Sequence, residues 1–110
     1  MSNDRTTLQQ LVAISGRNTV HTVLHYLYFP TRDGAAEVAA HLRDLGFTVE
    51  ERLGADGMNW LVLAKHDVIP SERIIAASRQ TMTDFTAGHG GEYDGWEADV
   101  KSSTNGAGRR

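Results

Sequence analysis

The sequence predicts a single α+β domain in which two helices pack on one face of a four-stranded antiparallel sheet. Two observations predict this class. The residue pattern changes between strand-like alternation and helix-like periodicity in the order strand, helix, strand, strand, helix, strand. A glycine or a proline also stands at most of the junctions. This is the order of ferredoxin-like α/β sandwiches, in which the first and third strands are central and the last strand lies at an edge beside the first.

The length of the chain, 110 residues, suits one domain with a modest core. We expect residues 1–100 to form this domain and residues 101–110, which are small and polar, to be a disordered tail. The absence of cysteine excludes disulfides and cysteine-ligated metals. The longest apolar run, residues 60–64, is far too short to span a membrane, and the first residues lack the pattern of a signal peptide.

Helical periodicity predicts three helices, at residues 7–16, 31–45 and 71–87. The two long helices have apolar stripes at spacings of three and four, and a glycine follows each of them. Pro70, just before the last helix, is typical of a helix start. The stripes consist of Ala35, Val38, Ala39, Leu42 and Leu45, and of Ile75, Ser78, Met82 and Phe85. The first helix has a narrower stripe, so we expect it to dock on the main body, with a frayed tail as the alternative.

Alternating patterns predict four strands, at residues 20–29, 47–53, 59–66 and 90–100. The first is rich in β-branched and aromatic residues on both faces, which is typical of a central strand. The second and third are joined by the glycine-bearing turn at residues 54–57, so they form a hairpin.

The last strand has the most distinctive pattern. Strict alternation would mix acids and aromatics on both faces, whereas one extra residue at Gly95, a β-bulge, separates them. The acidic face then contains Glu92, Asp94, Glu97 and Asp99, and the apolar face contains Tyr93, Trp96, Ala98 and Val100. The acids, with the edge of one of the two aromatics, form a candidate partner-recognition surface. The pattern is also typical of an ordinary half-buried strand, with a solvated face over a buried one, and the spacing alone favours that interpretation.

Two histidines, His21 and His25, have the spacing of a helical metal pair, but on a strand they lie roughly 13 Å apart and do not share an ion. We therefore expect no metal site, and we expect His25 to be a core histidine bonded to the backbone or to a neighbouring strand. The only catalytic combination that we can assemble is His25, His66 and Asp94, without a nucleophile at a recognisable turn. An enzyme is not expected, and neither is a cofactor.

An RNA-binding sheet is an alternative, because ferredoxin-like sheets can stack bases on exposed aromatics such as Tyr26 and Tyr28. Only Arg52 and Lys65 supply positive charge on the nearby strands, and the formal net charge of the chain is −3. Nucleic-acid binders usually present a basic surface, so direct nucleic-acid binding is disfavoured. An open sheet face or edge would also allow a homodimer.

Three segments together resemble the RraB family, the B-type protein regulators of ribonuclease E activity. They are HTVLHYL at residues 21–27, GFTV at 46–49 and EYDGW at 92–96, and the resemblance extends over about residues 7 to 100. It implies a ferredoxin-like sandwich with an added N-terminal helix, in a cytoplasmic, non-catalytic bacterial protein. Better-known members have a long acidic C-terminal extension, which residues 101–110 do not resemble.

The resemblance also implies a protein partner, an endoribonuclease of the ribonuclease E type. By binding this nuclease, the protein would restrain the decay of RNA. Membrane partners are not expected. An acidic face could bind the basic RNA-binding segments of such a nuclease and compete with RNA. The residues that we assign to partner binding are Glu92, Tyr93, Asp94, Trp96, Glu97 and Asp99.

Overall fold

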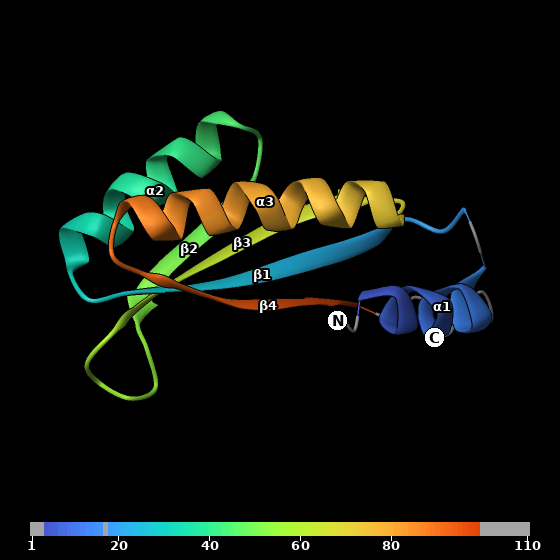
Figure 1. Cartoon of the computed structure of the whole chain (residues 1–110), viewed down its shortest axis with the longest axis horizontal. Helices are drawn as coiled ribbons and strands as arrows, with labels where there is room; N and C mark the ends of the chain where they lie inside the picture. The colour runs from blue at the N-terminus through green and yellow to red at the C-terminus, as the bar shows by residue number, and fades with distance from the viewer. Residues whose placement is uncertain (1–3, 17, 100–110) are drawn as a thin grey trace.

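The computed structural model describes residues 4–16 and 18–99. Its elements are α1 (Asp4–Ser15), β1 (His21–Phe29), α2 (Arg32–Asp44), β2 (Thr48–Leu53), β3 (Trp60–Val68), α3 (Glu72–Gly88) and β4 (Glu92–Ala98). The strands form one antiparallel sheet in the order β2-β3-β1-β4. Figure 1 shows α2 and α3 together on one side of this sheet and α1 near one end of it. The tail expected at residues 101–110 lies outside the described residues.

The order of the elements confirms the predicted α+β class with four antiparallel strands and helices on one face. β1 and β3 are central, and β4 lies at the edge beside β1, as expected. The ferredoxin-like assignment stays a prediction. β3 runs two residues past its predicted end because it pairs with β1 along its whole length, up to the pair of His21 with Val68.

Side-chain caps fix where α2 and α3 begin. The hydroxyl of Thr31 accepts a hydrogen bond from the Gly34 amide at 3.0 Å, and that of Ser71 accepts one from the Ile74 amide at 3.1 Å. The end of α2 differs from the prediction. Leu45 was expected in the apolar stripe, but the helix ends at Asp44, and Leu45 is a 60% exposed cap residue.

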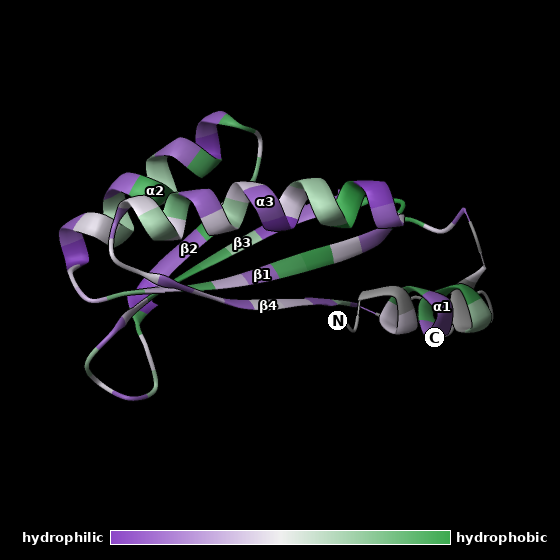
Figure 2. Ribbon diagram, in the orientation of Figure 1, coloured by the Kyte–Doolittle hydropathy of each residue, from purple (hydrophilic) through white to green (hydrophobic). Residues whose placement is uncertain are grey.

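The main core lies between the sheet and the two long helices. Its fully buried side chains come from alternate positions of β1 and β3 and from the helix stripes: Leu27, Phe29, Val38, Ala39, Leu42, Val62, Ala64 and Met82. A smaller cluster, Leu8 with Val23 and Ile75, lies where α1 packs against α3. Figure 2 shows the same alternation along the helices, where hydrophobic bands follow hydrophilic ones. Because Leu8 of α1 packs against the main body in the smaller cluster, the predicted docking of the first helix is confirmed.

The turn from α3 into β4 brings two backbone segments unusually close together. A Cβ atom at Gly91 would lie 2.5 Å from the carbonyl oxygen of Tyr28 and 2.6 Å from Cδ1 of Phe29. Only glycine avoids these overlaps, so the start of β4 can lie directly against the end of β1. This contact fixes the position of the acidic residues that follow.

Candidate functional site

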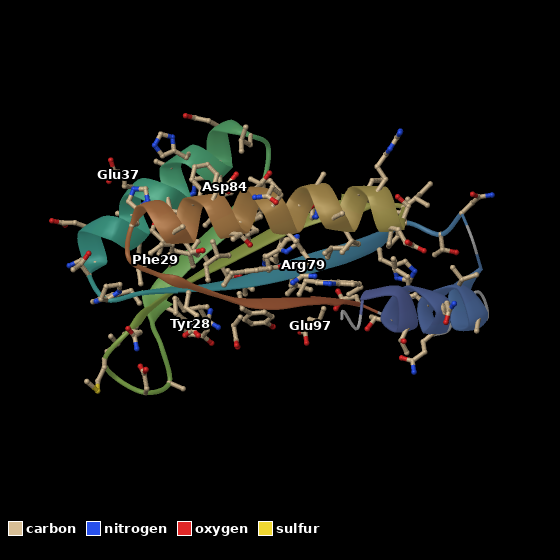
Figure 3. All side chains as sticks on the ribbon, viewed as in Figure 1. Tyr28, Phe29, Glu37, Arg79, Asp84 and Glu97 are labelled. Atoms are coloured by element: carbon tan, nitrogen blue, oxygen red, sulfur yellow. The ribbon has the colours of Figure 1, made fainter. Side chains whose placement is uncertain are left out.

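The face of the sheet opposite α2 and α3 is not covered by a helix of the described chain (Figure 1). We call it the open face. On the central strands its residues are Thr22, Leu24, Tyr26 and Tyr28 of β1 and Leu61, Leu63, Lys65 and Asp67 of β3. Figure 3 shows Tyr28 and Phe29 on opposite sides of the sheet, with Phe29 toward the helices. The open face thus presents the half-buried Leu24, Tyr26 and Tyr28 beside the buried Leu61 and Leu63.

β4 adds acidic side chains to this face. In the pairing with β1, Glu92 stands opposite Tyr28 and Glu97 opposite Leu24, and the register shifts between these two pairs. Gly95, in the shifted segment, has a φ of 107°, a left-handed conformation that glycine adopts readily. The bulge predicted at Gly95 is therefore confirmed. We call Glu92, Asp94 and Glu97, all three exposed, the β4 acids.

The two β4 aromatics lie on the other side of the strand. Tyr93 packs against the main core, and Trp96 packs with Ala98 against the smaller cluster near α1. Both are half-buried. The structure therefore separates the six residues assigned to partner binding: the β4 acids lie on the open face, and the aromatics lie beneath it. The aromatic side chains that lie beside the β4 acids are instead Tyr26 and Tyr28 of β1. The sequence does not assign them to partner binding, because it does not show which face of the sheet the helices cover.

Asp99, the remaining member of that set, follows β4 and is exposed. Its amide donates to the carbonyl oxygen of Thr22 at 3.0 Å, and its own carbonyl oxygen accepts from the ring of His21. The backbone of Asp99 therefore holds the end of β4 against the start of β1. The role of all six residues in partner binding stays a prediction.

Charges on the open face are distributed unevenly. Lys65 and Arg52 both bind the carboxylate of Glu50, at 2.8 and 2.9 Å, and the bond to Lys65 is the main cause that lowers the pKa of Glu50. The basic side chains of this face are thus already paired. Glu92 and Asp94, in contrast, form no hydrogen bond or ion pair with any residue that the structure describes. The β4 side of the open face is therefore an uncompensated negative surface.

The two open-face tyrosines differ in their bonding. The hydroxyl of Tyr26 donates to Glu97 at 2.8 Å, and this bond is the main cause that raises the pKa of Tyr26. The Tyr28 hydroxyl has no such partner within the described ranges. Tyr26 is therefore engaged with a carboxylate of its own chain, whereas Tyr28 is not.

At one end of the open face lies an open groove of about 400 Å³, which we call the Tyr28 groove. Its lining residues come from three separate segments: Tyr28, Pro30, Ala55, Asp56, Asn59, Gly90, Gly91, Glu92 and Asp94. Figure 1 shows the β2–β3 loop projecting from the sheet on the side away from the helices. Ala55, Asp56 and Asn59 of this loop form one wall of the groove.

Hydrogen bonds hold that loop in place. The Asp56 carboxylate accepts from the amides of Asn59 and Met58, at 3.0 and 2.9 Å, and from the side-chain amide of Asn59 at 2.8 Å. These bonds, led by the Asn59 amide, lower the pKa of Asp56 to about 2. The loop wall of the groove is therefore preformed and charged at neutral pH.

On the helix side of the sheet, His25 is fully buried in a small polar cluster. Its Nδ1 lies 2.9 Å from the Tyr93 hydroxyl and its Nε2 lies 3.3 Å from Nε2 of His66, and the ring of Phe47 packs against both imidazoles. Burial, followed by the charge of His66, lowers the pKa of His25 to about 4. Burial also lowers the pKa of His66. The expectation of a core histidine bonded to neighbouring strands is confirmed.

The catalytic combination drawn from the sequence is not assembled. His25 and His66 meet on the helix side, whereas Asp94 lies on the open face. His21 and His25 have separate partners, the Asp99 carbonyl and the cluster above. Over residues 4–16 and 18–99, no group of three or more histidine, cysteine or acidic side chains is placed to hold a metal ion. No helix within those ranges is long and apolar enough to cross a membrane.

A family model described as regulator of ribonuclease activity B matches residues 3–98, which is nearly the whole chain. No curated protein matches the sequence.

Proposed function

Since the chain belongs to the RraB family, the regulators of ribonuclease activity B, we propose that it binds an endoribonuclease of the ribonuclease E type and slows its cleavage of RNA. The family is one of regulators and not of catalysts. We place the protein in the bacterial cytoplasm, where such a nuclease acts. The strand order β2-β3-β1-β4 with antiparallel pairing supports the ferredoxin-like assignment.

The observation that carries the proposal is the uncompensated acidic surface of β4. A nuclease holds the phosphate backbone of RNA with basic segments. The β4 acids complement such segments, whereas the basic side chains of the open face are already bound to Glu50. Opposite charges accelerate the encounter of two proteins and set which surfaces meet. Occupation of a basic RNA-binding segment by this surface competes with RNA and so slows cleavage.

The test is a binding and cleavage assay with purified protein and the cognate ribonuclease E. We expect dose-dependent binding and slower RNA cleavage. Reversal of all three β4 acids to lysine is expected to weaken binding by about ten-fold or more, because attraction becomes repulsion. A matched control reverses three exposed acids of the helix layer, Glu37, Asp44 and Asp84. If wild-type protein and nuclease do not associate at micromolar concentration, the proposed function is wrong.

RNA binding is the second candidate, because Tyr26 and Tyr28 alternate with the buried residues of β1 and so lie on the open face. The neighbouring β4 acids repel phosphate, so we expect no tight, salt-sensitive binding in a fluorescence anisotropy titration with single-stranded RNA. Such binding would reverse the ranking of the two functions. A homodimer through the open face is disfavoured on the same grounds, because it would bring two sets of β4 acids together.

A further inference from the structure

We propose that the Tyr28 groove is the seat of an arginine side chain from the protein partner, with its guanidinium stacked on Tyr28 and bonded to Glu92 and Asp94. This inference rests on the proposed function and adds to it a site, a ligand chemistry and an orientation. The occupant is an arginine-bearing segment of a protein. The proposal rests on three observations: the groove itself, the Tyr28 ring at its floor, and the unpaired carboxylates on its wall.

The floor of the groove is the aromatic ring of Tyr28, and a glycine lies close to the backbone of this residue and another to the edge of its ring. Tyr28 is half-buried at the end of β1, and the backbone at Gly91 lies directly against its carbonyl group. On the other side, a Cβ at Gly54 would lie 3.4 Å from Cε1 of the ring and 2.9 Å from the carbonyl oxygen of Asn59. The two glycines therefore allow close approach, Gly91 to the backbone of Tyr28 and Gly54 to the edge of its ring, and the half-buried ring has fewer orientations to lose on binding than an exposed one.

The wall of the groove carries negative charge at the edge of this ring. Glu92 is the direct cross-strand neighbour of Tyr28, so the two Cβ atoms lie roughly 5 Å apart. Asp94 follows on the same face and also lines the groove. Neither carboxylate is paired with a described residue. An aromatic face bounded by unpaired carboxylates is the environment that a cation prefers.

Among cations, the geometry favours a guanidinium over an ammonium. A guanidinium is planar, stacks on a ring and still directs its N–H groups outward to two carboxylates. A lysine would be a strongly hydrated point charge above the same ring. RNA bases could stack on Tyr28, but the attached phosphates would face Glu92, Asp94 and Asp56. The charge therefore selects a basic protein segment over RNA, and also over a second, equally acidic copy of this chain.

The test is an NMR titration of the full chain with three synthetic nine-residue Gly-Ser peptides, which carry two central arginines, lysines or citrullines. Citrulline keeps the shape of arginine and removes its charge. We expect the arginine peptide to shift the amide signals of Gly91 and Glu92, and to bind about ten-fold more tightly than the citrulline peptide. Equal binding of the arginine and citrulline peptides overturns the inference. Tighter binding of the lysine peptide also overturns it.

Variants measure the contribution of the Tyr28 ring and that of the two carboxylates to binding separately. Tyr28→Leu, and the pair Glu92→Gln with Asp94→Asn, are each expected to weaken arginine-peptide binding by about ten-fold. Tyr28→Phe keeps the ring and is expected to bind like the wild type. If Tyr28→Leu does not fold, the Glu92 and Asp94 pair, which leaves the ring in place, still tests the inference. The control pair, Asp44→Asn with Asp84→Asn, removes two exposed charges from the helix layer and is expected to change nothing. Unchanged binding by the Glu92 and Asp94 pair overturns the inference.

The same variants distinguish this inference from the proposed function. If the nuclease binds the wild type and Tyr28→Leu equally well, the regulator function stands and the arginine seat is wrong. If the nuclease does not bind at all, the regulator function is wrong, and the peptide titration alone decides the inference. Shifts of the Gly91 and Glu92 signals by a single-stranded RNA oligonucleotide, at concentrations where the arginine peptide gives none, assign the groove to RNA and overturn it.

Discussion

His25 lies in the protein interior between the hydroxyl of Tyr93 and the imidazole of His66. The two facing Nε2 atoms can share only one proton, so the cluster is satisfied when both rings are neutral. Protonation of either ring would place a charge in a buried site, next to a second ring that could also take up a proton. The cluster therefore links the stability of the fold to pH.

The free energy of unfolding is expected to fall as the pH drops from 6.5 to 4. In the unfolded chain His25 takes up its proton near pH 6.5, whereas in the folded protein it does so only near pH 4. The unfolded state therefore binds more protons across this window, at a cost of about 3 kcal/mol of stability. Urea unfolding at both ends of the window measures the loss.

The control for this prediction is a histidine outside the cluster. His25→Gln is expected to show a smaller loss than the wild type, because glutamine does not titrate. His41→Gln replaces an exposed histidine of α2 by the same residue, glutamine, and serves as the matched substitution outside the cluster. An equal pH dependence in wild type and His25→Gln would assign the effect to other titrating groups, such as His66 or carboxylates.

At the scale of elements, the bulge in β4 decides which side chains share a face. The two residues Asp94 and Gly95 stand opposite the single residue Tyr26, so the strand changes its alternation at this point. Without the extra residue, Glu97 would turn toward the core and Trp96 toward the open face. The acidic surface and the buried aromatics are two results of one backbone irregularity.

Replacement of Gly95 by alanine is expected to destabilise the domain by about 1–2 kcal/mol, because an L-residue is strained at a φ of 107°. Gly88→Ala is the matched control. This glycine ends α3, and a Cβ there would meet no atom within 4 Å. Alanine is expected to raise stability there by about 0.5–1 kcal/mol. Thermal or urea unfolding of both variants gives the comparison, and equal effects would contradict the left-handed requirement at Gly95.

At the scale of the whole molecule, one face of the sheet forms the core with the helices and the other face is left for binding a partner. α2 and α3 bury one side of the sheet and leave the other side available along its length (Figure 1). β2 is drawn largely in hydrophilic colours, while β3 beside it is largely hydrophobic (Figure 2). The negative charge of the open face is concentrated at the opposite edge, on β4.

Because this charge is exposed, association with the nuclease is expected to depend on ionic strength. Raising the salt concentration from about 0.05 M to about 0.5 M shortens the screening length to a few ångströms. The association rate should then fall by about ten-fold or more, with a smaller change in the dissociation rate. Stopped-flow or surface-based kinetics at both salt concentrations provide the measurement. A salt-independent association rate would show that the β4 acids do not steer the encounter.

The parts of this molecule that the sequence predicts are those with a local cause. Glycine and proline positions delimit the elements, and the spacing around Gly95 reveals the bulge before any partner strand is known. The contact between His25 and His66 is different, because it depends on the register between β1 and β3. The Tyr28 groove likewise combines three segments that only the folded sheet brings together. The exposure of Tyr28 and the partial burial of Trp96 depend on which face the helices cover.

Both outer strands of the sheet carry charged residues along their length, since β2 reads TVEERL and β4 reads EYDGWEA. Strand edges with this composition resist the addition of a strand from another copy, and the bulge in β4 further disturbs the regular spacing that such pairing needs. A sheet with one uncovered face would otherwise be prone to form fibrils. We therefore expect concentrated solutions of the protein to stay clear during long storage, without the lag and growth phases of amyloid formation.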